Sequence, residues 1–323
     1  MSIKQPAMKK FLLIIAAAVL FASCAAEPAF EQTEEVGPFT VKLIEKNVWH
    51  VEDCNSSNPH GFGVRPDGTT GFNACSDMYI IRGKKKALLI DLSNNVRWAE
   101  GADEALRSIF YSRAGDREKL ITITHNHGDH TGMLHAFIEN KDIRYALPEK
   151  DFNRLVERFP GIDYSFINEG HVFDLGDIEV KTIEVPGHTD GSMVFSITGR
   201  DILLTGDAIG SGHGVWIFNT EAFNNYAAAV PHLISWIEDP ANSVNAEQLR
   251  IYGGLYWQRD WFPELEGKEM GMSYLNEMLD LVNEIKAGTA GTEPSGLDHP
   301  VLDTYFRHGM AIVVWNAEQA QQL

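Results

Sequence analysis

The sequence predicts an α/β fold in which two β-sheets pack face to face and helices cover them on the outside. Two observations support this prediction. Strand-like runs come in two sets, and helix-like segments follow each set. The chain of 323 residues is 44% hydrophobic and 10% aromatic, so it can bury a substantial core within one large domain.

The first set of strand-like runs is joined by turn-forming residues and comprises FTVKLIE (39–45), NVWHVED (47–53), DMYIIR (77–82) and KALLID (86–91). Helix-like segments then alternate with strands, with helices near 98–110, 130–139 and 149–158 and strands at KLITIT (119–124) and IRYAL (143–147). The second set comprises HVFDL (171–175), IEVKTIEV (178–185), SMVFSI (192–197) and DILLTG (201–206). After it come a helix near 221–238, the strand LRIYGG (249–254), a helix near 269–287 and terminal strands within 301–315.

The first 24 residues differ from the rest, because three lysines precede the apolar run FLLIIAAAVLFASC. This run is too short to span a membrane comfortably and is typical of a secretory signal peptide. It ends in FASC, which resembles a bacterial lipoprotein cleavage site with Cys24 as the acylated residue; ordinary cleavage near Ala25 or Ala26 is the alternative. We therefore expect an exported protein, periplasmic or tethered to the outer membrane through Cys24, with a linker at 25–38 and one domain at 39–323.

Cysteine content is consistent with export. Besides Cys24 the chain contains only Cys54 and Cys75, an even pair that indicates a disulfide in an oxidising compartment. Two unconnected buried thiols remain the alternative, because sequence does not fix their separation. The segment between them is rich in Gly, Asn, Ser and Pro, which predicts a long loop.

Net charge argues against one class of partner. The formal charge is −18, and removal of the three signal-peptide lysines makes it −21. A protein this anionic repels phosphate backbones, so we expect a small-molecule substrate and no nucleic-acid partner. Nothing in the sequence indicates the oligomeric state.

The motif HNHGDH directly follows an apolar strand. His125 and His127 are two residues apart, so both imidazoles can point to the same side. Asp129 and His130 follow at the expected start of a helix. Together they offer nitrogen and oxygen donors of the kind that Zn²⁺ prefers. The alternative is a solvated helix start with Asp129 as N-cap, which leaves three histidines unexplained.

Two further candidates lie at later strand ends, His188 in EVPGHTDGS and Asp207 in ILLTGDAIG. In this order, H-x-H-x-D-H, P-G-H-T and T-G-D-A resemble the motifs of the metallo-β-lactamase superfamily, over roughly residues 39–316. The resemblance implies a four-layer αββα sandwich. It is specific for the superfamily but not for a substrate.

The resemblance also implies metal ligands and a reaction. A first zinc site would consist of His125, His127 and His188, with Asp129 and His130 in a second site and Asp207 bridging the two. Three neutral imidazoles leave a fourth position on Zn²⁺, where water ionises near pH 7. The implied protein is a hydrolase with one or two Zn²⁺ ions, whose metal-bound hydroxide attacks an ester, thioester, lactone or lactam carbonyl. With one metal, Asp129 would be free to orient or deprotonate the water.

The chain departs from the family pattern at one expected ligand. Family members usually complete the second site with a histidine in a GGH or PGH turn, where this chain has Leu255 in LRIYGGLYW. A leucine cannot bind metal, so Gln258, Asp260 or His213 would have to complete the site. We expect the second site to be weak or empty. The rival interpretation is a non-catalytic metal- or ligand-binding protein on a degenerate fold of this family.

Overall fold

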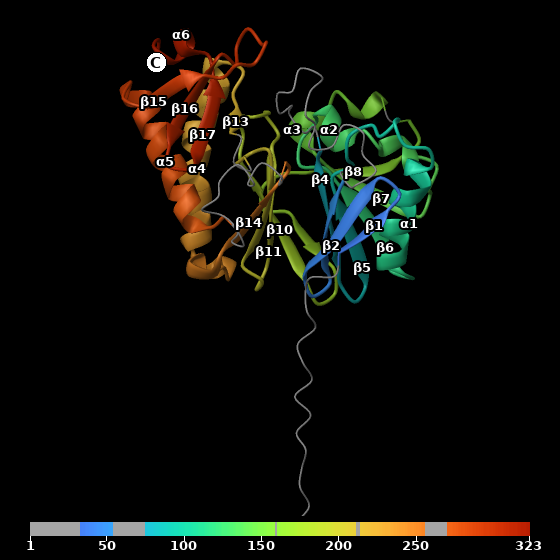
Figure 1. Cartoon of the computed structure of the whole chain (residues 1–323). Helices are drawn as coiled ribbons and strands as arrows, with labels where there is room; N and C mark the ends of the chain where they lie inside the picture. Colours follow the sequence, from blue (N-terminus) through green and yellow to red (C-terminus); the bar gives the residue numbers. More distant parts are fainter. Residues whose placement is uncertain (1–32, 54–74, 159, 211–213, 256–269) are drawn as a thin grey trace, which may run out of the picture.

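The computed structural model describes residues 33–53, 75–158, 160–210, 214–255 and 270–323 (Figure 1). Within them, an eight-stranded and a five-stranded sheet lie face to face, and helices cover the outer face of each. A third, four-stranded sheet lies against the helices of the second half. This αββα arrangement is the one predicted from the order of strand-like and helix-like segments.

The eight-stranded sheet runs in sequence order: β1 (Thr33–Val36), β2 (Phe39–Glu45), β3 (Val48–Glu52), β4 (Asp77–Arg82), β5 (Lys86–Ile90), β6 (Glu118–Thr122), β7 (Ile143–Pro148) and β8 (Asp163–Ile167). Strands β1 to β5 pair antiparallel, and β5 to β8 pair parallel. Helix α1 (Ala102–Ala114) covers the outer face of this sheet, on which its side chains Leu106 and Phe110 pack. Because the parallel strands end at one edge, the residues that follow them gather there.

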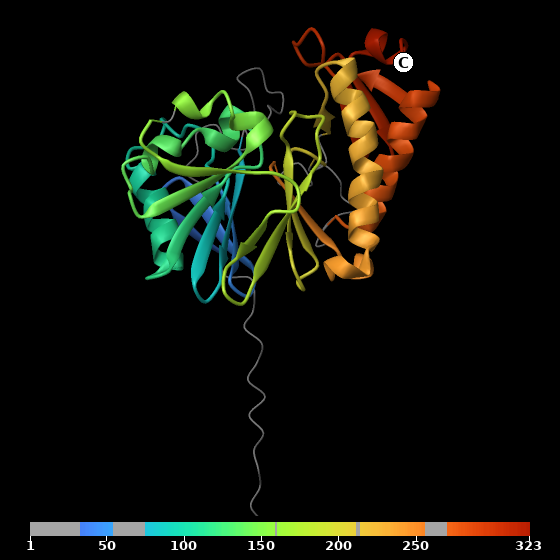
Figure 2. The ribbon, with the colours of Figure 1, turned by 180° about the vertical axis from the view of Figure 1, so that it is seen from behind.

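The five-stranded sheet has the order β14 (Arg250–Gly253), β12 (Ile202–Gly206), β11 (Met193–Ile197), β10 (Glu179–Glu184) and β9 (Val172–Asp174). Its outer face is covered by α4 (Thr220–Glu238) and α5 (Met272–Ala287), as the view from behind shows (Figure 2). Asn219 directly precedes α4, and its side chain accepts a hydrogen bond from the Ala222 amide and so caps the helix. Strands β12 and β14 run parallel, so their ends also meet at one edge.

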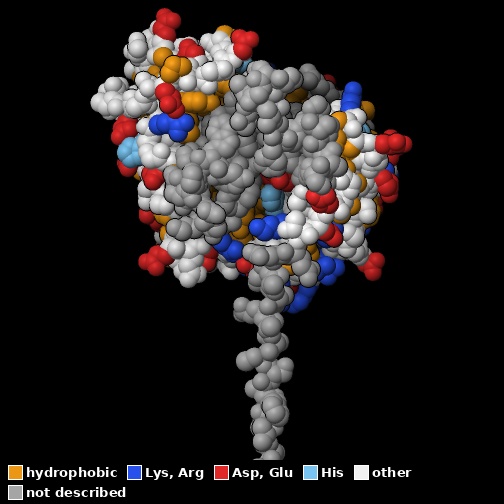
Figure 3. Space-filling view, viewed as in Figure 1, with side chains coloured by type: hydrophobic (Ala, Val, Ile, Leu, Met, Phe, Trp, Pro, Cys, Tyr) orange, Lys and Arg blue, Asp and Glu red, His pale blue; other side chains and the backbone are white. Residues whose placement is uncertain are grey.

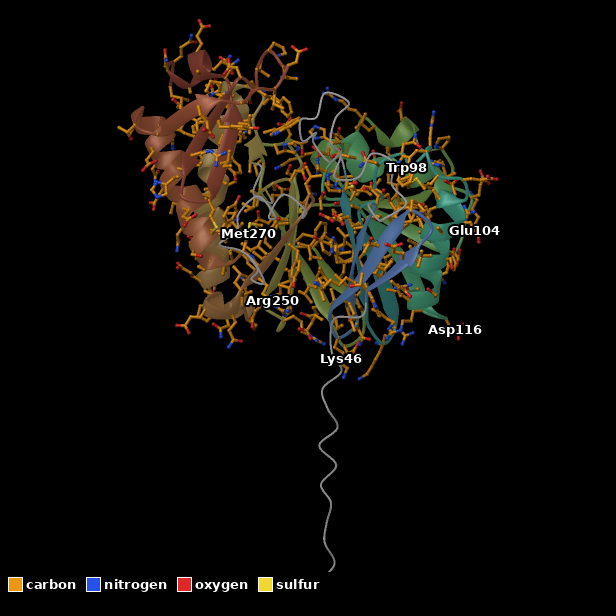
Figure 4. The ribbon with its side chains drawn as sticks, in the orientation of Figure 1. Lys46, Trp98, Glu104, Asp116, Arg250 and Met270 are labelled. Carbon is orange, nitrogen blue, oxygen red and sulfur yellow. The ribbon has the colours of Figure 1, made fainter. Side chains whose placement is uncertain are left out.

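Apolar side chains fill the space between the two sheets, among them Ile81 and Leu88 from the first sheet and Phe195 and Leu204 from the second. At the lower end of the molecule, Glu45 joins the sheets by ion pairs of 3.2 Å with Arg200 and 3.0 Å with Arg250. Figure 4 labels Arg250 and the neighbouring Lys46 at this end. The C-terminal ends of β6 and β12 lie at the end of the molecule opposite to these ion pairs.

The four-stranded sheet has the order β13 (Val215–Trp216), β17 (Ala311–Trp315), β16 (Thr304–His308) and β15 (Gly291–Pro294). The short helices are α2 (Gly128–Thr131), η1 (Leu134–Ala136), α3 (Glu149–Phe152), η2 (Val156–Arg158), η3 (Pro240–Asn242), η4 (Ala246–Gln248) and α6 (Ala317–Ala320). Acidic side chains are spread around the visible described surface, in keeping with the net charge of −18 (Figure 3).

The structure corrects the sequence prediction at several elements, among them the helix expected at 149–158, which is divided into α3 and η2. Residues 33–36, assigned to the linker, form β1 and pair with β2, so the ordered domain begins earlier. The single helix expected at 130–139 is broken into α2 and η1. Between α2 and η1 the amides bond to the loop after β5, because the Gly132 amide donates to the Ser93 carbonyl and the Met133 amide to the Leu92 carbonyl. These amides are therefore not available for a continuous helix.

Two predictions fall outside the described residues. Cys75 is buried, but Cys54 lies in 54–74, so the disulfide stays a prediction. The signal peptide lies in 1–32 and also stays a prediction. Among the described helices, none has the length and hydropathy needed to cross a membrane.

Candidate metal centre

Three predicted histidines converge where β6 and β10 end. His125 and His127 follow β6, and His188 follows β10. One ring nitrogen from each lies within 4.8 Å of the other two, and His188 Nε2 is 2.8 Å from His127 Nδ1. This spacing suits three donors around one ion.

Hydrogen bonds to the far ring nitrogens fix which nitrogen of each buried histidine faces the cluster. His188 Nδ1 donates to the Trp216 carbonyl at 3.0 Å, which leaves Nε2 free to coordinate. The Thr124 hydroxyl donates to Asp91 at 2.8 Å, so His125 Nδ1 donates to that hydroxyl at 3.0 Å. Both histidines therefore present an unprotonated Nε2.

Burial supports this protonation state. Burial lowers the pKa of His188 to about 4, although the carboxylate of Asp207 partly opposes the shift. Burial and the neighbouring histidines place the pKa of His125 well below its usual value. Both imidazoles are thus neutral at neutral pH, the form that binds metal.

A second group of donors adjoins the first and shares His125 with it. His125, His130 and Asp207 also bring donor atoms within 4.8 Å of one another. His130 Nε2 lies 3.3 Å from Asp207 Oδ1 and 3.6 Å from Asp129 Oδ2. All six residues of the sequence-predicted set therefore meet at one place.

Carboxylates dominate the charge of the second group. Burial alone would lower the pKa of His130, but Asp129, Asp207 and Asp91 outweigh it and raise that pKa well above its usual value. Burial alone would raise the pKa of Asp207, yet His130 and the other histidines lower it to about 2. The metal-free group therefore holds a proton on His130 that a cation would displace.

Unpartnered atoms show that these residues fit a metal ion. His125 Nε2 is buried and makes no hydrogen bond to a described residue, and the buried His130 Nε2 and Asp207 Oδ1 face only each other there, at 3.3 Å. A buried polar atom without a partner costs about 1–3 kcal/mol. A cation that displaces the proton of His130 and binds between these three atoms would offset that cost. Nitrogen and carboxylate oxygen are also donors that Zn²⁺ prefers.

The sequence analysis missed Asp91, which organises the donors of both groups. It follows β5, is buried, and accepts hydrogen bonds from the Thr124 amide at 2.6 Å and from His130 Nδ1 at 2.9 Å. Asp91 thereby orients His130 directly and His125 through Thr124. Its sequence signal is an aspartate directly after the apolar strand KALLI, which is too common to stand out alone.

Asp151 was also missed. This buried carboxylate accepts hydrogen bonds from the Asn126 amide at 2.9 Å, the Thr189 hydroxyl at 2.8 Å and the Gly191 amide at 2.7 Å. It therefore joins the loop after β6 to the loop after β10. No local pattern marks it, because its partners lie 25 to 40 residues away in sequence.

Leu255 lies at the second group, where the sequence analysis placed it. It lines the same cavity as Asp129 and Asp207. The preceding Gly254 packs so closely that a Cβ there would lie 2.5 Å from Asp207 Oδ1 and 2.7 Å from His130 Cε1. Residues Gln258, Asp260 and His213, the suggested substitutes, lie outside the described residues.

Replacing Leu255 by histidine is expected to strengthen the second site, because an imidazole would supply the donor that leucine lacks. In a zinc titration of metal-free protein, the stoichiometry of tight binding should rise from about one to about two ions per chain. Leu255→Ala, which removes hydrocarbon without adding a donor, is the matched control and should leave it unchanged. Two tightly held ions in the wild type would show that the second site is already complete.

A cavity of about 150 Å³ opens over the donors. Its described lining combines the acidic and histidine side chains with an apolar side formed by Trp216, Phe218 and Leu255. The arrangement thus places the candidate metal ligands at a site that a small molecule can enter.

Comparisons with known proteins agree with this geometry. The chain is 29% identical over 140 residues to an atrochrysone carboxyl ACP thioesterase of Claviceps purpurea, covering 43% of this chain and 41% of that protein. It is 36% identical over 97 residues to a hydroxyacylglutathione hydrolase of a Chelativorans species, covering 30% of this chain and 36% of that protein. The chain therefore spans well under half the length of these relatives.

Solved structures share the fold. A metallo-β-lactamase from Erythrobacter litoralis superposes with a TM-score of 0.52 at 14% identity, covering 78% of this chain and 100% of that one. One from Pontibacter korlensis gives a TM-score of 0.51 at 19% identity, with 78% and 99% covered. The family model of the metallo-β-lactamase superfamily matches residues 76–237, which contain all six predicted metal-site residues. The chain belongs to the metallo-β-lactamase superfamily.

Proposed function

We propose that this protein is a zinc-dependent hydrolase that cleaves an ester, thioester, lactone or lactam at the candidate metal centre. The observation that carries the proposal is the convergence of His125, His127 and His188, with ring nitrogens within 4.8 Å of one another beside an open cavity. Relatives named as an ACP thioesterase and as a hydroxyacylglutathione hydrolase support placing thioesters first among the substrates to test.

The residues have separable roles in this reaction. A zinc ion held by the three histidines would supply Lewis-acid chemistry, polarising the carbonyl and lowering the pKa of water. Asp129, which lines the cavity, accepts the proton of the attacking water. The water oxygen bonds to the carbonyl carbon, and the bond from that carbon to the leaving oxygen, sulfur or nitrogen breaks. The proton then passes from Asp129 to the leaving group.

The test is hydrolysis by metal-free and zinc-loaded protein of a panel containing one thioester, ester, lactone and β-lactam. We expect at least one carbonyl class to be hydrolysed by the loaded protein, and activity to disappear with a chelator and return with zinc. Tight zinc binding without hydrolysis of any class would overturn the proposal and favour a non-catalytic metal-binding protein.

We further propose that the protein is exported and anchored through an acylated Cys24, in keeping with the apolar run that ends in FASC. Replacing Cys24 by alanine should move the protein from the membrane fraction to the soluble fraction of an expressing bacterium. Mass spectrometry of the mature N-terminus provides the direct measurement. An unacylated N-terminus near Ala25 or Ala26 in the wild type would contradict the anchor.

A further inference from the structure

We infer that Trp216 and Phe218 form the binding surface for the acyl group of the substrate, and that this group is apolar and about the size of one aromatic ring. The inference rests on the proposed hydrolase function and names its substrate class. The favoured substrate is an ester or thioester of a benzoyl-sized acid.

The position of Phe218 connects the apolar side of the cavity to the reacting carbonyl. The ring centroid of Phe218 lies 6.0 Å from that of His127 and 6.0 Å from that of His188. An acyl carbon attached to a carbonyl at the histidines therefore reaches the Phe218 ring directly. Aromatic rings at such separations prefer edge-to-face or offset contacts, which a second ring can make.

Trp216 is tied to the same site through its backbone. Its carbonyl accepts the hydrogen bond from His188 Nδ1 at 3.0 Å, and its side chain lines the cavity. Any shift of this strand would move His188 as well. The acyl-binding surface and the metal ligands thus keep a fixed separation.

The four-stranded sheet holds Trp216 and Phe218 in place. Strand β13 pairs with β17 through Val215 and Val313 and through Trp216 and Val314 (Figure 1), and Trp216 also lines the cavity. Trp216 and Phe218 pack on a buried apolar cluster that includes Leu302. A surface that is ordered before substrate arrives binds an apolar group without paying for side-chain ordering.

Size and charge restrict the acyl group. The cavity volume is about 150 Å³, the volume of an apolar protein cavity that accommodates one benzene molecule; because the reacting carbonyl shares this space, one aromatic ring is the upper limit for the acyl group. No lysine or arginine is present among the described residues that line it, whereas Asp129 and Asp207 are. An acyl group bearing a free carboxylate would be repelled by Asp129 and Asp207, and no described lysine or arginine lines the cavity to pair with it.

The test uses the zinc-loaded mature chain with benzoyl, acetyl and succinyl thioesters of one thiol, so that only the acyl group varies. We expect kcat/KM to be at least about tenfold higher for the benzoyl than for the acetyl thioester, because one hydrophobic pocket contact discriminates by about 10- to 200-fold. The succinyl thioester should be the poorest substrate.

Variants locate the preference. Trp216→Ala and Phe218→Ala should each lower the ratio of kcat/KM for the benzoyl thioester to that for the acetyl thioester by about tenfold. Phe218→Leu keeps an apolar side chain against the cluster, so it tests whether the effect of Phe218→Ala comes from misfolding. This variant should retain zinc and lose only part of the benzoyl preference. Tyr164→Ala, at a surface tyrosine that is 43% exposed on β8, is the matched aromatic control and should change neither substrate.

The outcomes separate the two proposals. Hydrolysis of no carbonyl substrate overturns the proposed function and this inference together. Hydrolysis without a benzoyl preference, or with a preference that Trp216→Ala and Phe218→Ala leave intact, overturns only the acyl-binding role of these two residues.

Discussion

Replacing His125 by alanine is expected to remove tight zinc binding and to lower kcat/KM by more than about 100-fold. His125 occurs in both donor groups, and its Nε2 is buried without a hydrogen-bond partner among the described residues. Removing an outer partner of a metal ligand already costs about 10–100-fold in affinity or activity, so loss of the ligand itself should exceed that range. Zinc content by mass spectrometry and kcat/KM on the best panel substrate measure both effects.

His135→Ala is the control for this experiment. His135 lies five positions past His130 in η1, is exposed, and contacts Asp103 at 3.0 Å, away from both groups. It should retain full zinc and activity. A His125→Ala protein that keeps one tightly bound zinc ion and wild-type turnover would contradict the assignment of His125.

Replacing Asp151 by alanine should both destabilise the protein and weaken metal binding. The carboxylate holds Asn126, Thr189 and Gly191 by three hydrogen bonds, which fix the loops that carry His127 and His188. Hydrogen bonds to charged groups contribute about 1.5–3 kcal/mol each, and the donors left behind are partly buried. We expect a loss of about 3–5 kcal/mol in the free energy of unfolding and about 10- to 100-fold in zinc affinity.

A neighbouring carboxylate provides the matched control. Asp190 lies between Thr189 and Gly191 in the same loop, but its side chain is exposed. Asp190→Ala should change neither the denaturation midpoint nor zinc affinity appreciably. Asp151→Asn keeps the shape and one acceptor oxygen, so it should recover part of both losses. Equal effects of Asp151→Ala and Asp190→Ala would show that Asp151 does not position the loops.

The donors were predictable from sequence because their chemistry is local. HNHGDH places several metal-competent side chains directly after a strand, and His188 and Asp207 each follow a strand that sequence periodicity also detects. Asp91 and Asp151 were missed for the opposite reason. Each is a lone aspartate whose role depends on backbone and side-chain groups that only the folded chain brings near.

The apolar side of the cavity could not be predicted either. Strand β13 has two residues, Val215 and Trp216, and exists only through pairing with β17, almost a hundred positions later. Strand β1 was missed because TEEV is acidic and largely exposed, so it lacks the alternation that marks a half-buried strand. In both cases backbone pairing decides the structure, with the adjacent β2 for β1 and with the distant β17 for β13, and local composition does not report it.

X-ray absorption at the zinc edge tests most directly the claim that His125, His127 and His188 bind a metal ion. With one equivalent of zinc added to the metal-free protein, we expect a shell of imidazole nitrogens at about 2.0–2.1 Å, with outer-shell scattering from three histidines. The His188→Ala variant should show one imidazole fewer. A shell without imidazole scattering, or one that His188→Ala leaves unchanged, would contradict the claim.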